Sequence, residues 1–436
     1  MLKSTGTRIA VRLRALPTLA WVMAGFMLAY VLYFLLPVFL SGSSMRFPMV
    51  LPTMTPIGAD LRETMTFVQA WLHGGGTPYI GTATYPPLSY ALFAPLLQIE
   101  PSVRYVLFSI LTVVCFGVAA LWFPLKASGE KQVTPELLLV FATGLISYGL
   151  QFELERGQAN VIAVTLALAA IWLFHSGKGR DLWAYGLFSL SVQLKLYPLV
   201  FILMFVRDWR DWKSNVKRLS LLILANYVLL FALGWRISLD FVRAVRGVIV
   251  RGNLIGIRNH SIHGFVGQAS QIVAAEGTPW SRAHVSLLEN EILAIVAICL
   301  ALLVFKAWRE NARGVNAELL LACSVSALVI PTVSYDYTLA TLAGPVGLLL
   351  IFLRGRDAEA NRRISIGVAT MLFCFAYAST LLPLNYRPGR LGLQSSLPAL
   401  VVMLLAVTFM AVRLRTARGT DAPRGADSDG AQSPVR

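Results

Sequence analysis

The chain has 436 residues, of which 56% are hydrophobic and only 14% are charged. Soluble domains carry about 25% charged residues, so this composition excludes an ordinary soluble enzyme and indicates a membrane protein. The net charge of +16 does not indicate nucleic-acid binding, because the basic residues gather at the ends of apolar runs, as in membrane proteins.

Apolar runs of a length suited to a bilayer recur along the whole chain. They cover residues 19–40, 107–125, 161–174, 219–234, 292–305, 319–330, 338–353, 364–382 and 397–412. We therefore expect an all-α polytopic membrane protein with roughly 12 transmembrane helices. The first run lacks a cleavage site and is expected to be retained. A single transmembrane domain would cover residues 1–418, followed by a disordered cytoplasmic tail at 419–436.

Clusters of Lys and Arg define the expected sidedness. They occur at the N-terminus and at residues 207–218, 306–313, 354–363 and 413–419. Both chain termini are therefore expected in the cytoplasm, and the protein is expected in the cytoplasmic membrane. The first outer loop at 41–85 and the large outer loop at 236–286 then face the outside, where we expect short amphipathic helices.

Residues 85–206 allow two threadings. In the first threading, residues 86–98 form a full span. In the second threading they form a short surface-seated or re-entrant piece, so that 126–132 and 176–180 are cytoplasmic and 152–160 lies outside. The counts of Lys and Arg in these loops favour the second threading.

The first outer loop contains an amphipathic pattern at residues 58–72. Its apolar positions at helical spacing are Leu61, Met65, Val68 and Leu72. Asp60 stands at the start of this helix, with Glu63 three residues later. Asp60 either caps the helix together with Glu63 or serves as a general base on a hydroxyl group.

A polar segment at residues 153–160 separates two apolar runs. Its candidate substrate-binding residues are Glu153, Glu155, Arg156, Gln158 and Asn160. The segment is either a polar turn whose charges pair with each other or part of a site level with Asp60. In the second case, Gln158 and Asn160 would hydrogen-bond sugar hydroxyls.

Lys195 is a lone charge within the apolar run at 182–206. The second threading breaks this run into two short helices around Lys195 and Pro198, since proline disfavours a continuous helix. An isolated lysine is costly in lipid and is a functional candidate. Lys195 would neutralise a phosphate, or alternatively reach the membrane surface with its long side chain.

The segment at 251–265 is rich in polar residues. Those able to contact a phosphosugar are Arg258, Asn259, His260 and His263. No metal site is expected, because zinc needs three or four ligands and nothing nearby completes the set. Arg387 and Arg390 lie in an outward loop and are either interfacial anchors or anion ligands. Tyr335 and Asp336 are interpreted as the start of a helix.

Familiar phosphate-binding motifs are absent from the sequence. There is no Walker loop, no GxGxxG motif and no Asp-x-Asp motif outside the tail. A nucleotide-sugar enzyme with a metal-held diphosphate is therefore disfavoured. A donor that carries one phosphate on a lipid needs none of these motifs.

The ordered motifs resemble those of glycosyltransferase family 87 in the GT-C superfamily, the bacterial polyprenyl-phosphate-mannose-type transferases. The resembling residues are Asp60, Pro78, Tyr79, Tyr85, Pro86, Pro87, Gly157, Gln158, Asn160, Lys195, Pro198, Asn259 and Ser261. They occur in the family's order over roughly half of the chain. One departure from the family is the replacement of the aromatic residues that usually follow the Asp by Leu61, Arg62 and Glu63.

The resemblance implies a GT-C fold and an enzyme that needs no metal or cofactor. It would move a hexose, most simply mannose, from a polyprenyl-phosphate sugar to a hydroxyl of a lipid-linked or cell-envelope glycan. The reaction would occur at the outer face of the membrane with inversion at the anomeric carbon. Asp60 would be the base and Tyr85 would contact substrate. The residues implied at the leaving phosphate are Lys195, Arg258, His260 and Arg387.

Two other functions are compatible with the same residues. A transporter or flippase of a lipid-linked anion would use Lys195 as a counter-ion, although the sequence shows no internal repeat. A glycan ligase with a lipid-diphosphate donor would also use Arg and His residues of the outer loops.

Overall fold

The computed structural model describes residues 57–251 except 75 and 146, residues 259–354 except 276, 278 and 279, residues 395–419, and single positions at 20, 24, 366 and 370. Each named element within these residues is helical. In chain order they are α4 (Ala59–Gly74), α5 (Pro87–Phe93), η2 (Ala94–Gln98), α6 (Pro101–Gly117), η3 (Val118–Trp122), α7 (Phe123–Ser128), α8 (Pro135–Leu145), α9 (Tyr148–Arg156), α10 (Asn160–Ser176), η4 (Lys178–Arg180), α11 (Asp181–Leu194), η5 (Tyr197–Met204), α12 (Trp212–Leu229), α13 (Trp235–Arg251), α14 (Ile262–Ala275), α15 (Arg282–Glu310), α16 (Ala317–Val329), η6 (Asp336–Leu342), α17 (Ala343–Arg354) and α19 (Leu397–Gly419).

Several of these helices have the length and composition of membrane spans. Among the described residues, three continuous helical stretches qualify: Pro101–Ser128, Arg282–Glu310 and Asp336–Arg354. Helices α8 and α9, bent by 46° to each other, make a fourth if they count as one span. The described chain is thus all-helical and has the character of a multi-pass membrane protein. The roughly 12 spans and the GT-C fold stay predictions.

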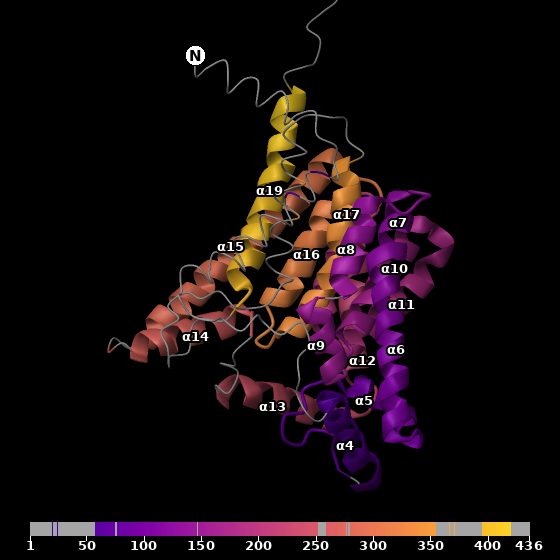
Figure 1. Ribbon diagram of the computed structural model, residues 1–436, viewed down its shortest axis with the longest axis vertical. Coiled ribbons are helices and arrows are strands. Elements are labelled where there is room, and N and C mark those ends of the chain that lie inside the picture. The colour runs from indigo at the N-terminus through magenta and orange to yellow at the C-terminus, as the bar shows by residue number, and fades with distance from the viewer. Residues whose placement is uncertain are drawn as a thin grey trace, which may run out of the picture.

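Between α4 and η5 the structure has the short helices that the second threading predicts, while the sidedness of the loops stays a prediction. Helix α5 has 7 residues and η2 has 5, which is far short of the ~20 that a span requires. Helix α11 ends at Leu194 and η5 begins at Tyr197, so the apolar run breaks at Lys195 as expected. The large loop was predicted to end at residue 286, but helix α15 already begins at Arg282, so the loop ends earlier than predicted. Helices α4, α5 and α13 gather at one end of the molecule, whereas α7 lies at the other (Figure 1).

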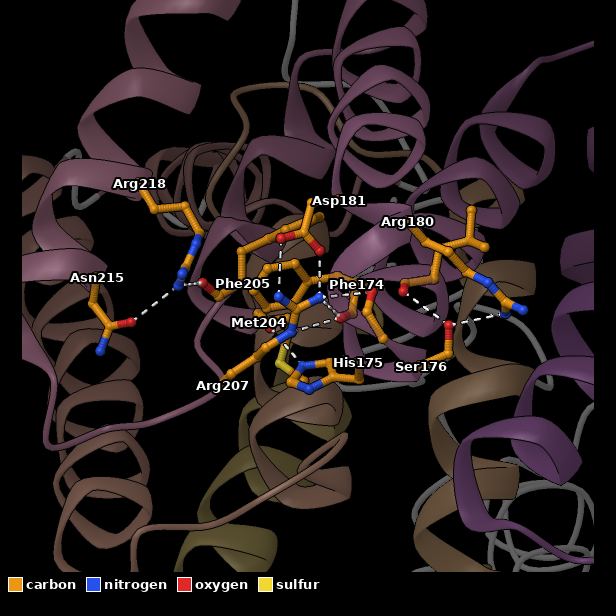
Figure 2. Close-up of polar contacts among 12 residues, drawn as sticks. Phe174, His175, Ser176, Arg180, Asp181, Met204, Phe205, Arg207, Asn215 and Arg218 are labelled. Carbon is orange, nitrogen blue, oxygen red and sulfur yellow. Dashed lines mark hydrogen bonds and ion pairs between the residues drawn. The ribbon is translucent and has the colours of Figure 1, made fainter.

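Helix α10 is held at both of its ends by charged side chains. At its N-terminus the buried Glu153 carboxylate accepts a hydrogen bond of 3.0 Å from the Val161 amide. At its C-terminus the Arg207 guanidinium donates to the Phe174 carbonyl at 2.9 Å and pairs with Asp181 (Figure 2). An anion at the start and a cation at the end complement the unpaired backbone groups and the helix dipole. Both contacts fix the apolar helix that leads away from residues 157–160.

The core lies around α16, whose residues from Ala317 to Val329 are all buried. Helix α17 packs beside it and approaches the α6–η3–α7 span closely. A Cβ atom added at Gly344 would lie 2.5 Å from the Ala119 carbonyl oxygen. The absence of a side chain at Gly344 is therefore what allows the two backbones to meet, a common device in membrane helix packing.

We expect Gly344→Ala to lower the stability of the protein by about 1–3 kcal/mol, because the added methyl group forces the two backbones apart. Thermal unfolding of the purified protein in detergent measures this change. Gly186→Ala is the matched control, since nothing lies within 4 Å of a Cβ at that position. An unchanged melting temperature for Gly344→Ala would contradict the close approach.

Candidate active site

Helix α4 is the amphipathic helix predicted at 58–72. Its buried face carries Leu61, Met65 and Val68, as the spacing predicts. Leu72, also assigned to that face, is 48% exposed. Asp60 lies in the first turn of α4, and its carboxylate contacts the chain at the end of α9.

The start of α4 is fastened to the end of α9. The Gly58 amide donates a hydrogen bond of 2.6 Å to the Glu155 carbonyl. Gly157 ends α9 with a φ of 66°, in the left-handed region that glycine adopts readily. A Cβ atom at Gly157 would also lie 2.8 Å from Cβ of Leu61. Glycine at 157 thus allows both the turn and the close contact that bring Asp60 to α9.

The Asp60 carboxylate is held by two side chains from that turn. Arg156 forms an ion pair with Oδ1, and the Gln158 amide nitrogen donates a hydrogen bond to Oδ2. The Asp60 side chain is 13% exposed and that of Arg156 is 28% exposed. Each carboxylate oxygen has two lone pairs, so both retain an acceptor position for an incoming hydroxyl group.

The side-chain amide of Gln158 connects Asp60 to Lys195. Its oxygen accepts hydrogen bonds from Lys195 Nζ and from the Tyr85 hydroxyl, both at 2.8 Å. Lys195 Nζ also lies 3.9 Å from the centroid of the Tyr85 ring, a distance typical of a cation–π contact. One amide is thus flanked by a carboxylate on one side and an ammonium group on the other.

Tyr85 remains a hydrogen-bond donor in this cluster. Burial raises the pKa of its phenol well above the ordinary value, and the negative charge of Asp60 raises it further. The hydroxyl group therefore stays protonated and holds the Gln158 oxygen in place. Tyr85 and Lys195 both donate to the oxygen of the Gln158 amide, so its nitrogen points toward Asp60.

Tyr335 and Tyr337 add aromatic surface next to the cluster. The Tyr337 ring lies 5.5 Å from that of Phe152 in α9 and 5.8 Å from that of Tyr335. Burial raises the pKa of the Tyr335 hydroxyl, and the nearby charges of Arg156 and Asp60 act on it in opposite directions. Neither tyrosine was predicted as a site residue, although two aromatic residues flanking Asp336 in a short loop were a signal.

Three buried polar residues connect the helices around the site, namely Glu153, Glu155 and Asn160. Glu153 and Asn160 are 0% and 1% exposed, and the Asn160 amide donates to Glu153 at 2.8 Å. Glu155 is also buried, and its backbone carbonyl receives the Gly58 amide. Glu153 and Asn160 thus join α9 to α10, and Glu155 joins α9 to the start of α4, while their role as substrate ligands stays a prediction.

Asn259 and His260 fasten their own segment to the loop before η6. The Asn259 side-chain oxygen accepts a hydrogen bond of 3.0 Å from the Ser334 amide. The His260 ring lies within 3.0 Å of the Ser334 and Thr338 hydroxyls, and both Asn259 and His260 are fully buried. Their polar atoms therefore hold η6 in position beside α9.

The other predicted ligands lie apart from Asp60 or outside the described residues. His263 Nδ1 is 2.8 Å from a carboxylate oxygen of Glu289, which joins α14 to α15. Arg258, Arg387 and Arg390 lie outside the described residues, as does the chain from 420 onwards. Within the described residues, no group of three His, Cys, Asp or Glu side chains is placed to hold a metal ion.

An apolar groove lies among the helices that follow Tyr85 and precede Lys195 in the chain. Its volume is about 970 Å³, and α5, α11 and α12 form its walls. Residues that line it are Leu88, Ala91, Leu92, Gly186, Leu190, Gln193, Lys217, Leu221 and Ala225. Leu88 lies three residues after Tyr85 and Gln193 lies two residues before Lys195, whereas Tyr85 and Lys195 do not themselves line the groove.

Comparisons with known proteins point to a glycosyltransferase. The model of glycosyltransferase family 87 matches residues 83–334, more than half of the chain. A polyprenol-phosphate-mannose-dependent alpha-(1-2)-phosphatidylinositol mannoside mannosyltransferase of Mycobacterium tuberculosis (strain ATCC 25618 / H37Rv) is 27% identical over 252 residues. That alignment covers 52% of this chain and 54% of the relative, so the chain spans about half the length of the relative. No solved structure matches the chain.

Proposed function

The chain belongs to glycosyltransferase family 87, and from this premise we propose that it transfers a hexose, most simply mannose, from a polyprenyl phosphate. The acceptor is a hydroxyl group on a lipid-linked or cell-envelope glycan. The similar mycobacterial protein is named for a polyprenol-phosphate-mannose donor and a phosphatidylinositol mannoside acceptor, which supports both substrate classes. Asp60 lies before the matched range, so its role rests on the geometry of the site.

The observation that carries this proposal is the arrangement of Asp60 and Lys195 on either side of the Gln158 amide. A carboxylate beside an ammonium group provides a base for the acceptor and a counter-charge for the leaving phosphate. Both functions are needed in one place for transfer from a sugar phosphate. Arg156 orients the carboxylate, and Tyr85 orients the amide between them.

In the proposed reaction, Asp60 accepts the proton of the acceptor hydroxyl. The resulting oxygen nucleophile attacks the anomeric carbon from the face opposite the phosphate. The bond between that carbon and the phosphate oxygen breaks, and its electron pair leaves with the polyprenyl phosphate. Lys195 offsets the charge of the leaving group. A single displacement of this kind inverts the anomeric centre, and proton and charge balance without a cofactor.

The charge pattern supports an outer position for this site. Asp60, residues 156–158 and Lys195 share one end of the described bundle, together with α4 and α5 (Figure 1). The basic loop at 176–180 follows α10 at its opposite end. Because cytoplasmic loops carry the excess of Lys and Arg, we propose that the Asp60 end faces the outside of the cytoplasmic membrane.

A reconstitution experiment tests the proposed function. The full chain in proteoliposomes receives radiolabelled mannosyl-phosphoryl-polyprenol and an envelope glycolipid acceptor. We expect label in the glycolipid and free polyprenyl phosphate as the second product. Equal use of a diphosphate donor would favour a ligase, and movement of unreacted donor across the bilayer would favour a transporter.

The apolar groove is proposed to hold the isoprenoid chain of the donor. We expect Gly186→Trp to raise the KM for a long-chain donor about tenfold, because the indole fills space that is open at Gly186. A donor with a two-isoprene chain should be affected less than twofold. Gly186→Ala, which leaves most of the groove open, is the control. Equal losses for both chain lengths would place the isoprenoid chain elsewhere.

A further inference from the structure

Two tyrosines that the proposed reaction does not use pack on the face of α9 that meets Asp60. The centre of the Tyr337 ring lies 5.5 Å from that of Phe152, and the Tyr335 ring lies 5.8 Å from that of Tyr337. Arg156 is four residues after Phe152 and therefore shares its face of α9. Because Arg156 pairs with Asp60, the tyrosine rings and the carboxylate lie along one face of this helix.

Tyr335 is the tyrosine beside the ion pair of Asp60 and Arg156. Burial raises the pKa of the Tyr335 hydroxyl, and the charges of Arg156 and Asp60 also act on it, so the ring lies close to both. Lys195 is connected to the other oxygen of the Asp60 carboxylate, through the amide of Gln158. The two carboxylate oxygens therefore have different neighbours, an ammonium group beyond one and an aromatic ring beside the other.

The hydroxyl group of Tyr335 is available to a ligand. Other tyrosines around the site use their hydroxyl groups inside the protein: Tyr79 and Tyr105 donate to backbone carbonyls at 2.9 and 3.0 Å, and Tyr85 donates to Gln158 at 2.8 Å. Within the part of the chain that the structure describes, nothing hydrogen-bonds the Tyr335 hydroxyl, and the residue is partly exposed. Tyrosine hydroxyls in buried or ligand-covered places usually have a partner, so packing alone does not account for this one.

The segment that carries Tyr335 is held on both sides. Its backbone pairs with that of Asn259 in an isolated bridge, and the Asn259 side chain accepts a hydrogen bond of 3.0 Å from the Ser334 amide. The Tyr335 carbonyl accepts hydrogen bonds of 2.9 Å from both the amide and the hydroxyl of Thr338. A Cβ atom at Gly149 in α9 would lie 3.1 Å from a backbone oxygen at the start of η6, so the two elements meet closely. A ring on such a support binds a ligand without the cost of ordering a loop.

An uncharged aromatic ring with a free hydroxyl group suits a sugar ring better than a phosphate. A pyranose ring has faces of C–H groups, which pack against the electron-rich face of an aromatic ring. Its edge carries hydroxyl groups and a ring oxygen, which accept hydrogen bonds from a phenol. An open-chain alcohol presents no such face. Because the acceptor hydroxyl must reach Asp60, the sugar ring beside Tyr335 is the one that carries this hydroxyl.

We propose that Tyr335 is a specificity-determining residue for the acceptor, packing against the pyranose ring that presents its hydroxyl to Asp60 and donating a hydrogen bond to that ring. Tyr337 supports the Tyr335 ring from behind, through its contact with Phe152. The acceptor role rests on the proposed function, whereas binding of a pyranoside at Tyr335 does not. Contact with one face of the ring also limits which hydroxyl group can face the carboxylate.

Acceptor kinetics of the full chain in phosphatidylcholine nanodiscs test this contact. The two acceptors are octyl α-mannopyranoside and the octyl ether of mannitol, which carries its hydroxyl groups on an open chain. Wild type should have a KM about tenfold lower for the pyranoside, because only the ring gains the aromatic contact. This comparison of two acceptors requires no variant.

Substitutions at Tyr335 separate the ring from the hydroxyl group. Tyr335→Leu should raise the KM for the pyranoside about tenfold, since the aromatic contact is lost. Tyr335→Phe keeps the ring and should raise this KM about threefold, the effect of one hydrogen bond. Neither variant should change the KM for the donor, which is proposed to bind at Lys195. A residue that only held the fold would affect both substrates alike.

Tyr227→Leu is the matched control. Tyr227 is 59% exposed on α12, its ring lies 5.3 Å from that of Phe231, and it is not among the residues that line the groove. The control makes the same change of side chain away from Asp60 and should keep both KM values of wild type. Melting temperatures show whether each variant is folded.

Saturation-transfer difference NMR detects the C–H protons of the bound pyranoside without any sugar transfer. We expect a signal in wild type and in Tyr227→Leu that is lost in Tyr335→Leu. This pattern without transfer by wild type would refute the proposed function and leave the pyranoside contact standing. Transfer by wild type with equal KM values for the two acceptors, or donor and acceptor KM raised alike in Tyr335→Leu, would overturn the role of Tyr335 and leave the proposed function intact. Absence of the signal in wild type overturns the pyranoside contact as well.

Discussion

Replacement of Asp60 by Asn is expected to lower sugar transfer by about 10³-fold, within the range attributed to a positioned general base. The amide has the size of the carboxylate but cannot accept the proton of the acceptor hydroxyl. Initial rates with radiolabelled donor in proteoliposomes measure this loss. Donor binding should be almost unchanged, because the effect lies in the chemical step.

Glu63→Gln is the control for Asp60→Asn. Glu63 lies one turn further along α4, is exposed and accepts a hydrogen bond from the Thr82 hydroxyl. Its loss should change the transfer rate by less than twofold. Melting temperatures for both variants should remain near that of wild type, since a partly exposed ion pair such as Asp60–Arg156 contributes only about 0–1 kcal/mol. Wild-type rates in Asp60→Asn would remove Asp60 as the base.

Replacement of Lys195 by Met is expected to reduce kcat/KM for the donor by about 10²-fold, because the leaving phosphate loses its counter-charge. Methionine preserves much of the aliphatic length of the side chain against the Tyr85 ring. Lys195→Arg should recover part of the activity, since it restores the positive charge. Steady-state kinetics with varied donor concentration provide the measurement.

A purely structural role for Lys195 predicts a different result. If Lys195 only held Gln158, its loss would leave the affinity for free polyprenyl phosphate unchanged. If it faces the phosphate, Lys195→Met should weaken binding of this product about tenfold. Lys213→Met, at the far end of α12, should alter neither quantity. Unchanged product affinity together with reduced transfer would assign Lys195 to positioning of Gln158 alone.

Local patterns in the sequence were sufficient to predict the helices and breaks that surround the site. The helical spacing of apolar residues predicted α4. Lys195 and Pro198 predicted the break between α11 and η5. The polar segment at 153–160 was one candidate for a turn, and the chain does turn at Gly157 after α9. Each of these features depends on local backbone preferences or on the spacing of apolar side chains along a helix. Residues only a few positions apart in the sequence determine both properties.

Which polar residues touch one another was decided only by the tertiary fold. From the sequence, Glu153, His260 and Lys195 were equal candidates for binding substrate. The structure places Glu153 at the N-terminus of α10 and His260 between two hydroxyl groups, while Lys195 contacts Gln158 and Tyr85. A buried polar group must find a partner, and the nearest one depends on which helices pack together.

The composition and the periodicity of this chain therefore specify a helical membrane protein with Asp60 at the head of a surface helix. They do not specify that Asp60 and Lys195 share the amide of Gln158, 98 and 37 residues away respectively. That arrangement requires α4, α9 and α11 to meet at one end of the bundle. The exposure of Arg236, Arg243 and Arg246 on α13 was also decided by the tertiary fold, because exposure is a property of the packed molecule and hydrophobic pattern is a property of the segment.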